Sequence, residues 1–304
     1  MSSLPGITDA TVLEYDQQKL AGIFAAVLQK NTTTQTWDWL HQASVKINEG
    51  QTLVMAFTQT PRKTGRAVCR ITEDEAALLK ELVPEFVFRG WTVDRWARVY
   101  LLVQLDVTDK NKYFGKIENL FDGAEINEQV ALYGALPLLA YPQQWVSRCA
   151  EGIRSNVADV LQSIMCYNPY PARHLGEAAW NQMVLKAFFT EKHIEQIIGL
   201  DERANPQLAS ILVDYAHERW AAHRTVNPLL WRCVSPFINA ENFGDIERVF
   251  HSENEVEVAA AALACNNSAY PPAAALVNGN SHLKNLIETG VVTWDTIAGN
   301  KVAF

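Results

Sequence analysis

The segment VSRCAEGIRSNVADVLQSI, residues 146–164, carries one apolar spacing twice in succession. Apolar side chains recur at positions i, i+3, i+4 and i+7, which is the spacing that lines one face of an α-helix. The segment therefore predicts two consecutive amphipathic helices. The first set is Val146, Cys149, Ala150 and Ile153, and the second is Val157, Val160, Leu161 and Ile164.

The same helical spacing recurs along the chain, whereas the strict alternation typical of a half-buried strand is hard to find. Residues 52–60 are the only candidate strand, and they fit a buried helix equally well. Several helix starts carry capping chemistry, either an S/T-x-x-E box or an Asn placed before a Pro. These starts are Thr72 with Glu75, Ser252 with Glu255, and Asn205 with Pro206.

The order of the predicted helices indicates the architecture. From residue 126 onward antiparallel helix pairs follow one another, and residues 255–277 resemble one unit of a HEAT-type array, although no strict repeat period is present. We therefore expect an all-α fold, an irregular right-handed α-superhelix that becomes HEAT-like toward the C-terminus. A single domain should cover residues 1–304, with residues 1–10 as a loosely ordered tail.

Composition excludes several classes of protein. Hydrophobic residues make up 48% and charged residues 20% of the 304-residue chain, so we expect a globular protein. A net charge of -8 without a basic run argues against nucleic acid as a partner. The longest apolar run, residues 130–141, is too short to span a bilayer, and the first residues lack a signal peptide. These features predict a cytoplasmic protein without a transmembrane segment.

The five cysteines are widely spaced, and no two form a CxxC pair. That pattern is typical of buried thiols in a reducing compartment rather than of disulfides or a zinc site. The chain also has no DDxxD, GxGxxG, P-loop or GxSxG motif. We therefore expect no cofactor and no metal.

A predicted helix over residues 178–190 is nearly apolar all round, with a narrow polar stripe at Gln182 and Lys186. Asn181 lies inside the apolar arc. Because a buried amide is unfavourable unless its donors and acceptors are paired, Asn181 should hold a specific hydrogen-bond network. Two interpretations stay open: it fixes a neighbouring backbone, which we favour, or it contacts a ligand directly.

A second predicted helix, residues 206–222, has Arg219 in the middle of its apolar stripe on a helical wheel. The expected core residues of this stripe are Leu208, Ile211, Leu212, Tyr215 and Ala216. An arginine keeps its charge, so it must either bend outward along its aliphatic stem or meet an anion. Asp201 and Glu202, just before the helix, are candidates for an ion pair. The alternative is an anion-binding site in a cleft.

Polar side chains of the same helix offer catalytic candidates. Asp214, His217 and Glu218 are spaced so that two of them could share a metal, but such residues on a polar face are more often solvated. The segment starts like a HExxH motif, yet Ala221 stands where the second histidine is needed, so the zincin interpretation fails. The best basic cluster is residues 61–66, where Arg62 and Lys63 could help to bind an anion. The alternative, which we favour, is a solvated turn.

Five segments resemble the EboA family: PRKTG at residues 61–65, NPYPA at 168–172, AWNQMVLKA at 179–187, GLDERANP at 199–206 and DYAHERWAA at 214–222. They match no catalytic signature. The resemblance implies association with the ebo gene cluster of bacterial secondary metabolism, whose products include enzyme-like proteins and a UbiA-type membrane prenyltransferase. It implies that the partners are other cluster proteins, a small metabolite or both, and it leaves room for peripheral association with the prenyltransferase.

Two hypotheses of function follow. The first is a non-catalytic helical scaffold or small-molecule carrier for the cluster enzymes, and the second is an enzyme that acts on a phosphorylated or polyhydroxylated intermediate by acid/base chemistry. We favour the first and leave open whether any reaction is catalysed. The ligand-binding candidates are Arg62, Lys63, Asn181, Lys186, Asp201, Arg203 and Arg219, and the catalytic candidates are Asp214, His217 and Glu218.

Overall fold

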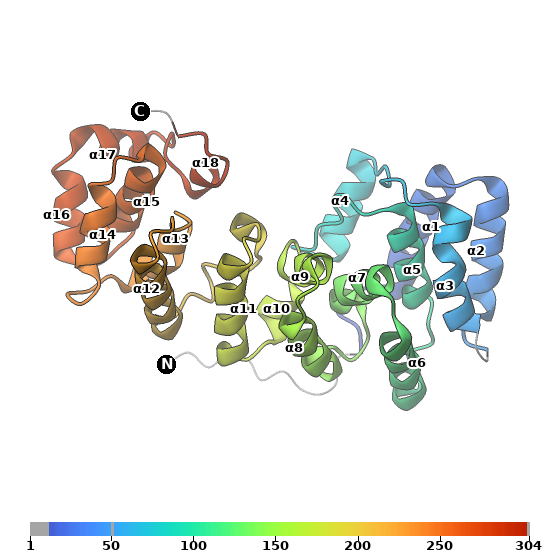
Figure 1. Ribbon diagram of the computed structural model, residues 1–304. Helices are drawn as coiled ribbons and strands as arrows, with labels where there is room; N and C mark the ends of the chain where they lie inside the picture. Colours follow the sequence, from blue (N-terminus) through green and yellow to red (C-terminus); the bar gives the residue numbers. More distant parts are fainter. Residues whose placement is uncertain (1–11, 50–51, 303–304) are drawn as a thin grey trace. The chain divides into compact units, whose positions relative to one another are not determined.

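The computed structural model describes residues 12–49 and 52–302. Eighteen α-helices and four short 3₁₀ helices lie in this part of the chain (Figure 1). The described residues contain no strand, and their β-type pairing is limited to one isolated bridge between Val68 and Thr92. The predicted all-α class is therefore confirmed.

The chain divides into two compact units, residues Met1–Leu175 and Gly176–Phe304. The single superhelical domain expected from the sequence stays a prediction, and the expected tail at residues 1–10 lies outside the described residues. The helices of the first unit are α1 (Gln17–Asn31), α2 (Thr34–Lys46), α3 (Thr52–Thr64), α4 (Glu73–Leu82), α5 (Val93–Val103), α6 (Lys110–Gly123), α7 (Ile126–Gly134), α8 (Val146–Arg154), α9 (Ala158–Met165) and α10 (Tyr170–His174).

Helix α5 is the central element of the first unit. It packs against α1, α3 and α7, and every residue in it except Arg95 is buried. Aromatic rings extend this core, because Phe24, Phe88 and Trp91 all lie within 6 Å of the Trp96 ring centroid, at 4.5, 5.1 and 5.9 Å. Large rings packed around one helix bury much apolar area, which is the main source of stability for this unit.

Helix α3 decides between the two interpretations of residues 52–60. They are helical, and the helix continues through the basic residues Arg62 and Lys63 to Thr64. The expected basic turn is thus the last turn of a helix that contains Pro61. A proline inside a helix cannot donate to the carbonyl four residues earlier, here that of Phe57. The Nε of the fully buried Arg98 donates to that carbonyl instead, at 3.1 Å.

The second unit contains α11 (Glu177–Phe189), α12 (Pro206–Ala221), α13 (Leu230–Val234), α14 (Phe243–Phe250), α15 (Glu255–Asn266), α16 (Pro271–Asn278), α17 (Ser281–Glu288) and α18 (Trp294–Ala298). Helix α15 is its core, and it contacts α13, α14, α16, α17 and α18. Its residues from Ala259 to Cys265 are all buried. Because most of these side chains are alanines, the surrounding helices can approach its backbone closely.

Helix caps test the predicted starts. Thr72 and Glu75 form the expected capping box at α4, and Asn205 caps α12 by accepting from the Leu208 amide at 2.8 Å. The third prediction is wrong: Asn254 caps α15, and the Ser252 hydroxyl binds Glu257. Asn and Ser are comparable caps, so the sequence alone could not rank two of them two residues apart.

Candidate functional site

A cleft of about 530 Å³ lies in the second unit. The end of α11, the last turns of α12 and the loop after it, the start of α15 and the end of α18 supply its walls. This volume is within the usual range for small-molecule sites. The lining residues are Phe188, Glu191, Lys192, His193, Glu195, Tyr215, Arg219, Thr225, Val226, Asn227, Pro228, Leu229, Asn254, Val256, Glu257, Ile297, Ala298 and Asn300.

Tight turns at two helix ends shape the walls. After α11, the Lys192 amide donates to the Ala187 carbonyl at 2.9 Å and the Glu191 amide donates to the Phe188 carbonyl at 3.2 Å, as in a Schellman motif. Glu191 adopts the left-handed conformation, with φ of 52°. Asn300 makes the corresponding turn after α18, with φ of 51°. Both turns reverse the chain at the cleft, so these residues lie on its rim.

Arg219 is the central cation of the cleft. Its Nε donates to the Thr225 carbonyl at 2.9 Å, and its guanidinium carbon lies 6.0 Å from the centre of the Tyr215 ring. The side chain is half-buried. Within the described part of the chain, no carboxylate lies within ion-pair distance of its guanidinium, and the two terminal amino groups are not engaged. Its orientation is therefore set through Nε alone.

Two carboxylates of the cleft already have partners. The Ser252 hydroxyl donates to Glu257 at 2.5 Å, and His193 Nδ1 lies 3.1 Å from Glu195 Oε1. Lys192 is half-buried and makes no ion pair with a described residue. The cleft thus combines two engaged carboxylates, an exposed carboxylate at Glu191, and cations without an ion-pair partner among the described residues.

The expected ion pair between Arg219 and the loop before α12 is not formed. Asp201 pairs with Arg232 through two hydrogen bonds, 2.6 Å from Nε and 2.5 Å from Nη2. Such a fork-shaped pair satisfies both carboxylate oxygens. Asp201 therefore has a structural partner, and Arg219 has the position that the alternative interpretation, an anion site in a cleft, requires.

The helical wheel misplaced the core face of α12. Of the expected core residues, Leu208, Leu212 and Ala216 are buried, but Ile211 and Tyr215 are only half-buried. Ala209 and Val213 are buried in their place. The packed face is rotated away from Arg219, so Arg219 and Tyr215 lie at its edge and reach the cleft.

Asn181 holds the hydrogen-bond network that its burial predicts. Its Nδ2 donates to Asn205 Oδ1 at 3.1 Å, and Asn205 Nδ2 donates back to Asn181 Oδ1 at 2.9 Å. Because Asn205 caps α12, the pair links the buried face of α11 to the start of α12. Beside it, the Arg203 guanidinium stacks on Trp180 with 4.8 Å between its carbon and the ring centre.

The catalytic candidates lie on the exposed side of α12. Asp214, His217 and Glu218 are exposed, and His217 Nε2 lies 2.8 Å from Asp245 Oδ1. None of the three lines the cleft as described. The structure therefore does not bring them together with Arg219.

The remaining candidates lie elsewhere. Arg62 and Lys63 belong to the first unit, where the Lys63 ammonium lies 5.8 Å from the centre of the Trp39 ring. Lys186 is half-buried on α11. Among the described cleft residues, Arg219 alone comes from the set proposed on sequence. The ligand-binding roles of the others stay predictions.

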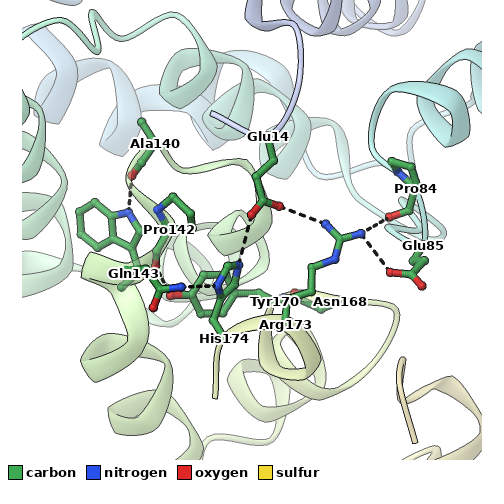
Figure 2. A network of polar contacts seen from close by, with 11 residues as sticks. Glu14, Pro84, Glu85, Ala140, Pro142, Gln143, Asn168, Tyr170, Arg173 and His174 are labelled. Carbon is green, nitrogen blue, oxygen red and sulfur yellow. Dashed lines mark hydrogen bonds and ion pairs between the residues drawn. The ribbon is translucent and has the colours of Figure 1, made fainter. Parts of the chain in front are cut away.

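A polar network surrounds the NPYPA segment in the first unit. Figure 2 shows Glu14 between Arg173, whose Nη1 lies 3.2 Å from it, and His174, whose Nε2 lies 3.8 Å from it. Arg173 also contacts the Pro84 carbonyl and Glu85 through Nη2. The network ties α10 to two distant parts of the sequence, so these contacts have a structural role within the unit.

His174 is the titratable centre of this network. Its side chain is only 5% exposed, and the Gln143 amide lies 3.2 Å from Nδ1. Since an amide nitrogen donates, Nδ1 accepts and the proton is on Nε2, facing Glu14. Burial lowers the pKa of His174 below its ordinary value of 6.5, and the opposing effect of Glu14 is smaller. The ring is therefore neutral at physiological pH.

Sequence reasoning missed most of the cleft. The spacing predicts Tyr215 in the core, and no local pattern singles out Lys192 or Thr225. Asn227 and Pro228 are typical of a break between helices and lie in the loop that forms one wall, but a break alone does not indicate which helices it faces. The start of α15 and the end of α18 complete the cleft from far along the sequence, and no local pattern connects them to Arg219.

The family comparison matches the chain with the description "Metabolite traffic protein EboA" over residues 20–235. This match covers more than half of the chain and shows that the chain belongs to the EboA family. Among curated proteins and solved structures, no match was found. The matched region includes Arg219 and the wall formed by the loop after α12, whereas the start of α15 and the end of α18 lie beyond it.

No helix in the described part of the chain is both long and apolar enough to cross a bilayer.

Proposed function

We propose that this protein is a non-catalytic carrier that binds a small metabolite in the cleft of its second unit and serves the enzymes of its gene cluster. The observation that carries the proposal is the 530 Å³ cleft, in which an oriented arginine without an ion-pair partner meets buried apolar side chains. Membership of a family described by metabolite traffic supports it.

A carrier needs a site that binds without reacting. The side chains most suited to acid/base chemistry, Asp214, His217 and Glu218, are on another side of α12, and His217 is engaged by Asp245. Within the cleft, His193 lies beside Glu195 and is the group through which the alternative hypothesis of acid/base catalysis would act. The separation of the three predicted catalytic residues from the cleft favours binding.

Native mass spectrometry of protein purified from a host that carries the whole gene cluster tests the proposal. We expect a small molecule to accompany the wild-type protein. Thr225→Trp should reduce its occupancy, because Thr225 is exposed in the cleft wall and a bulky ring there fills the space. The backbone carbonyl that binds Arg219 is retained in this variant.

Arg248→Gln is the matched control. Arg248 is exposed in the same unit and stacks on Trp220 at 4.2 Å, but it does not line the cleft as described. It should retain the ligand. Recovery of bare protein under all conditions, or equal occupancy in the Thr225→Trp variant, would count against the proposed carrier function. A ligand that is chemically altered on incubation would instead favour an enzyme.

A further inference from the structure

We propose that the ligand of the C-terminal cleft carries an acidic oxyanion, a carboxylate or a phosphate, on an apolar body, and that Arg219 binds this oxyanion through its terminal amino groups. The inference rests on the proposed function and adds the chemical class of the metabolite. Four features of the cleft carry it: the orientation of Arg219, the pairing of nearby carboxylates, a second cation and the apolar floor.

The orientation of Arg219 suits recognition of an oxyanion. Its Nε is held by the Thr225 carbonyl and its plane lies near the Tyr215 ring. A guanidinium fixed in this way keeps Nη1 and Nη2 in a rigid fork, which matches two oxygens of a carboxylate or phosphate. Because the fork is oriented before the ligand arrives, little side-chain entropy is lost on binding.

Neither cation of the cleft forms an ion pair with one of its three carboxylates, Glu191, Glu195 and Glu257. Glu257 accepts from Ser252 and Glu195 is beside His193, so both have partners other than Arg219 and Lys192. Glu191 lies exposed on the rim, where water and salt screen its charge. Lys192 contributes a second cation that makes no ion pair with a described residue. An oxyanion that enters the cleft would therefore meet two cations, neither of which has to break an ion pair with a described residue before it binds the oxyanion.

The floor of the cleft is apolar. Val226, Leu229 and Ile297 line it and are at most 5% exposed, so they form its deep part. The charged residues are more exposed and lie nearer the opening. A ligand that matches both parts has an apolar or aromatic body that packs on the floor and an acidic group that reaches Arg219.

Other arginines of the unit lack this combination. Arg232 is paired with Asp201 through two hydrogen bonds, Arg203 is stacked on Trp180, and Arg224 does not line the described cleft. Arg248 has an exposed guanidinium on Trp220 but does not line the described cleft. Arg219 and Arg248 form a matched pair for experiment. The guanidinium of each lies near an aromatic ring of α12, but only Arg219 lines the described cleft.

Isothermal titration of the full-length protein with three probes tests the inference. Benzoate carries a carboxylate, phenyl phosphate carries a phosphate, and benzamide has the same ring without charge. We expect one of the two anions to bind at least about tenfold more tightly than benzamide, because hydrogen bonds to charged groups contribute roughly 1.5–3 kcal/mol. The anion that binds more tightly identifies the source of the oxyanion.

Substitutions locate the effect. Arg219→Gln should remove the preference for anions, and Arg219→Lys should retain only part of it because an ammonium lacks the fork. Arg248→Gln should bind like the wild type. Unchanged thermal unfolding of the Arg219 variants without probe will show that they fold. An anion preference that survives Arg219→Gln, or that is lost equally in Arg248→Gln, overturns the inference.

The failure of this inference can be told from failure of the proposed function. If benzamide binds as tightly as both anions and Thr225→Trp abolishes all binding, the cleft is a ligand site and only the acidic class is wrong. If no probe binds the wild type and no cluster-derived molecule accompanies the protein, both are wrong. If an acidic probe alone binds and both Arg219→Gln and Thr225→Trp abolish it, both are supported.

Discussion

Arg98 donates a hydrogen bond from Nε to the carbonyl of Phe57 at 3.1 Å, and this carbonyl is the one that Pro61 leaves without a helical donor. Arg98 is fully buried, and its Nη1 pairs with Asp94 at 2.9 Å. One arginine thus completes the backbone of α3 and neutralises a buried carboxylate of α5. The same side chain therefore binds a helix carbonyl and a buried carboxylate, while Asp94 Oδ1 and Arg98 Nη2 are buried without a hydrogen-bond partner among the described residues.

Replacement of this arginine should strongly destabilise the first unit. Arg98→Met would leave the carboxylate of Asp94 buried without its cation and the Phe57 carbonyl without a donor. Breaking a buried pair in this way typically costs about 3–5 kcal/mol. Urea unfolding followed by circular dichroism should show this loss in the transition of the first unit.

Pro61→Ala tests the specific link between the two helices. Alanine restores an amide that can donate to the Phe57 carbonyl within α3, so the Arg98→Met, Pro61→Ala double variant should recover roughly 1 kcal/mol of the loss, the usual contribution of one hydrogen bond. Strict additivity of the two single effects would show that the carbonyl contact has no energetic role. The Asp94 penalty should persist in the double variant.

His174 should make stability depend on pH. Its folded-state pKa lies below the ordinary value of 6.5, so the unfolded chain binds more protons as pH falls below that value. The free energy of unfolding should therefore decrease with falling pH, from about pH 6.5 down to the folded-state pKa. Above pH 7 this residue should add no pH dependence.

His174→Gln is the test for this assignment, because glutamine does not titrate and can still hydrogen-bond. Urea midpoints measured between pH 5 and pH 7.5 should fall less steeply in the variant than in the wild type. Glu14 and Arg173 face the ring and are present in both proteins, so the difference between the two slopes reports on His174. Parallel pH profiles for the two proteins would contradict the assignment.

The cysteines should be chemically silent in the folded protein. All five are buried thiols that form no disulfide, as their spacing predicted. Burial raises the pKa of Cys69, Cys149, Cys233 and Cys265 to about 12, so their thiolate population at neutral pH is very small. Ellman's reagent should react slowly with the native protein. In 6 M guanidinium, which unfolds the protein, it should react readily with all five thiols. Rapid stoichiometric reaction of any one thiol before unfolding would show that its site opens.

The sequence predicts those features that depend on neighbours within one helical turn. The capping box at Thr72, the cap at Asn205 and the apolar face of α11 all follow from local spacing, and all are confirmed. The sequence also indicates that Asn181 needs hydrogen-bond partners, because any buried amide requires them. The identity of its partner, Asn205, depends on how two helices pack and has no local signal.

The cleft shows more clearly which features cannot be predicted from local sequence. A wheel of α12 shows that Arg219 shares a stripe with apolar residues, but the packed face is set by contacts with other helices and is centred nearer Ala209 and Val213. That rotation decides whether Arg219 is a buried ion-pair partner or a cleft residue. Asn300 and Ile297 reach the same cleft from the far end of the sequence, so only the tertiary fold could reveal it.

Glu191 is held in a conformation that glycine adopts more readily, so Glu191→Gly should stabilise the second unit. At φ of 52° a side chain costs roughly 1–2 kcal/mol, whereas glycine adds about 0.5–1 kcal/mol of backbone entropy to the unfolded chain. The net gain in the free energy of unfolding should be about 0.5–1 kcal/mol. Asn300→Gly is the control, because asparagine at φ of 51° already tolerates this conformation and should gain less. Thermal and urea unfolding of the ligand-free protein measure both changes. If Asn300→Gly stabilises the protein as much as Glu191→Gly or more, backbone strain at the cleft rim is not what distinguishes the two turns.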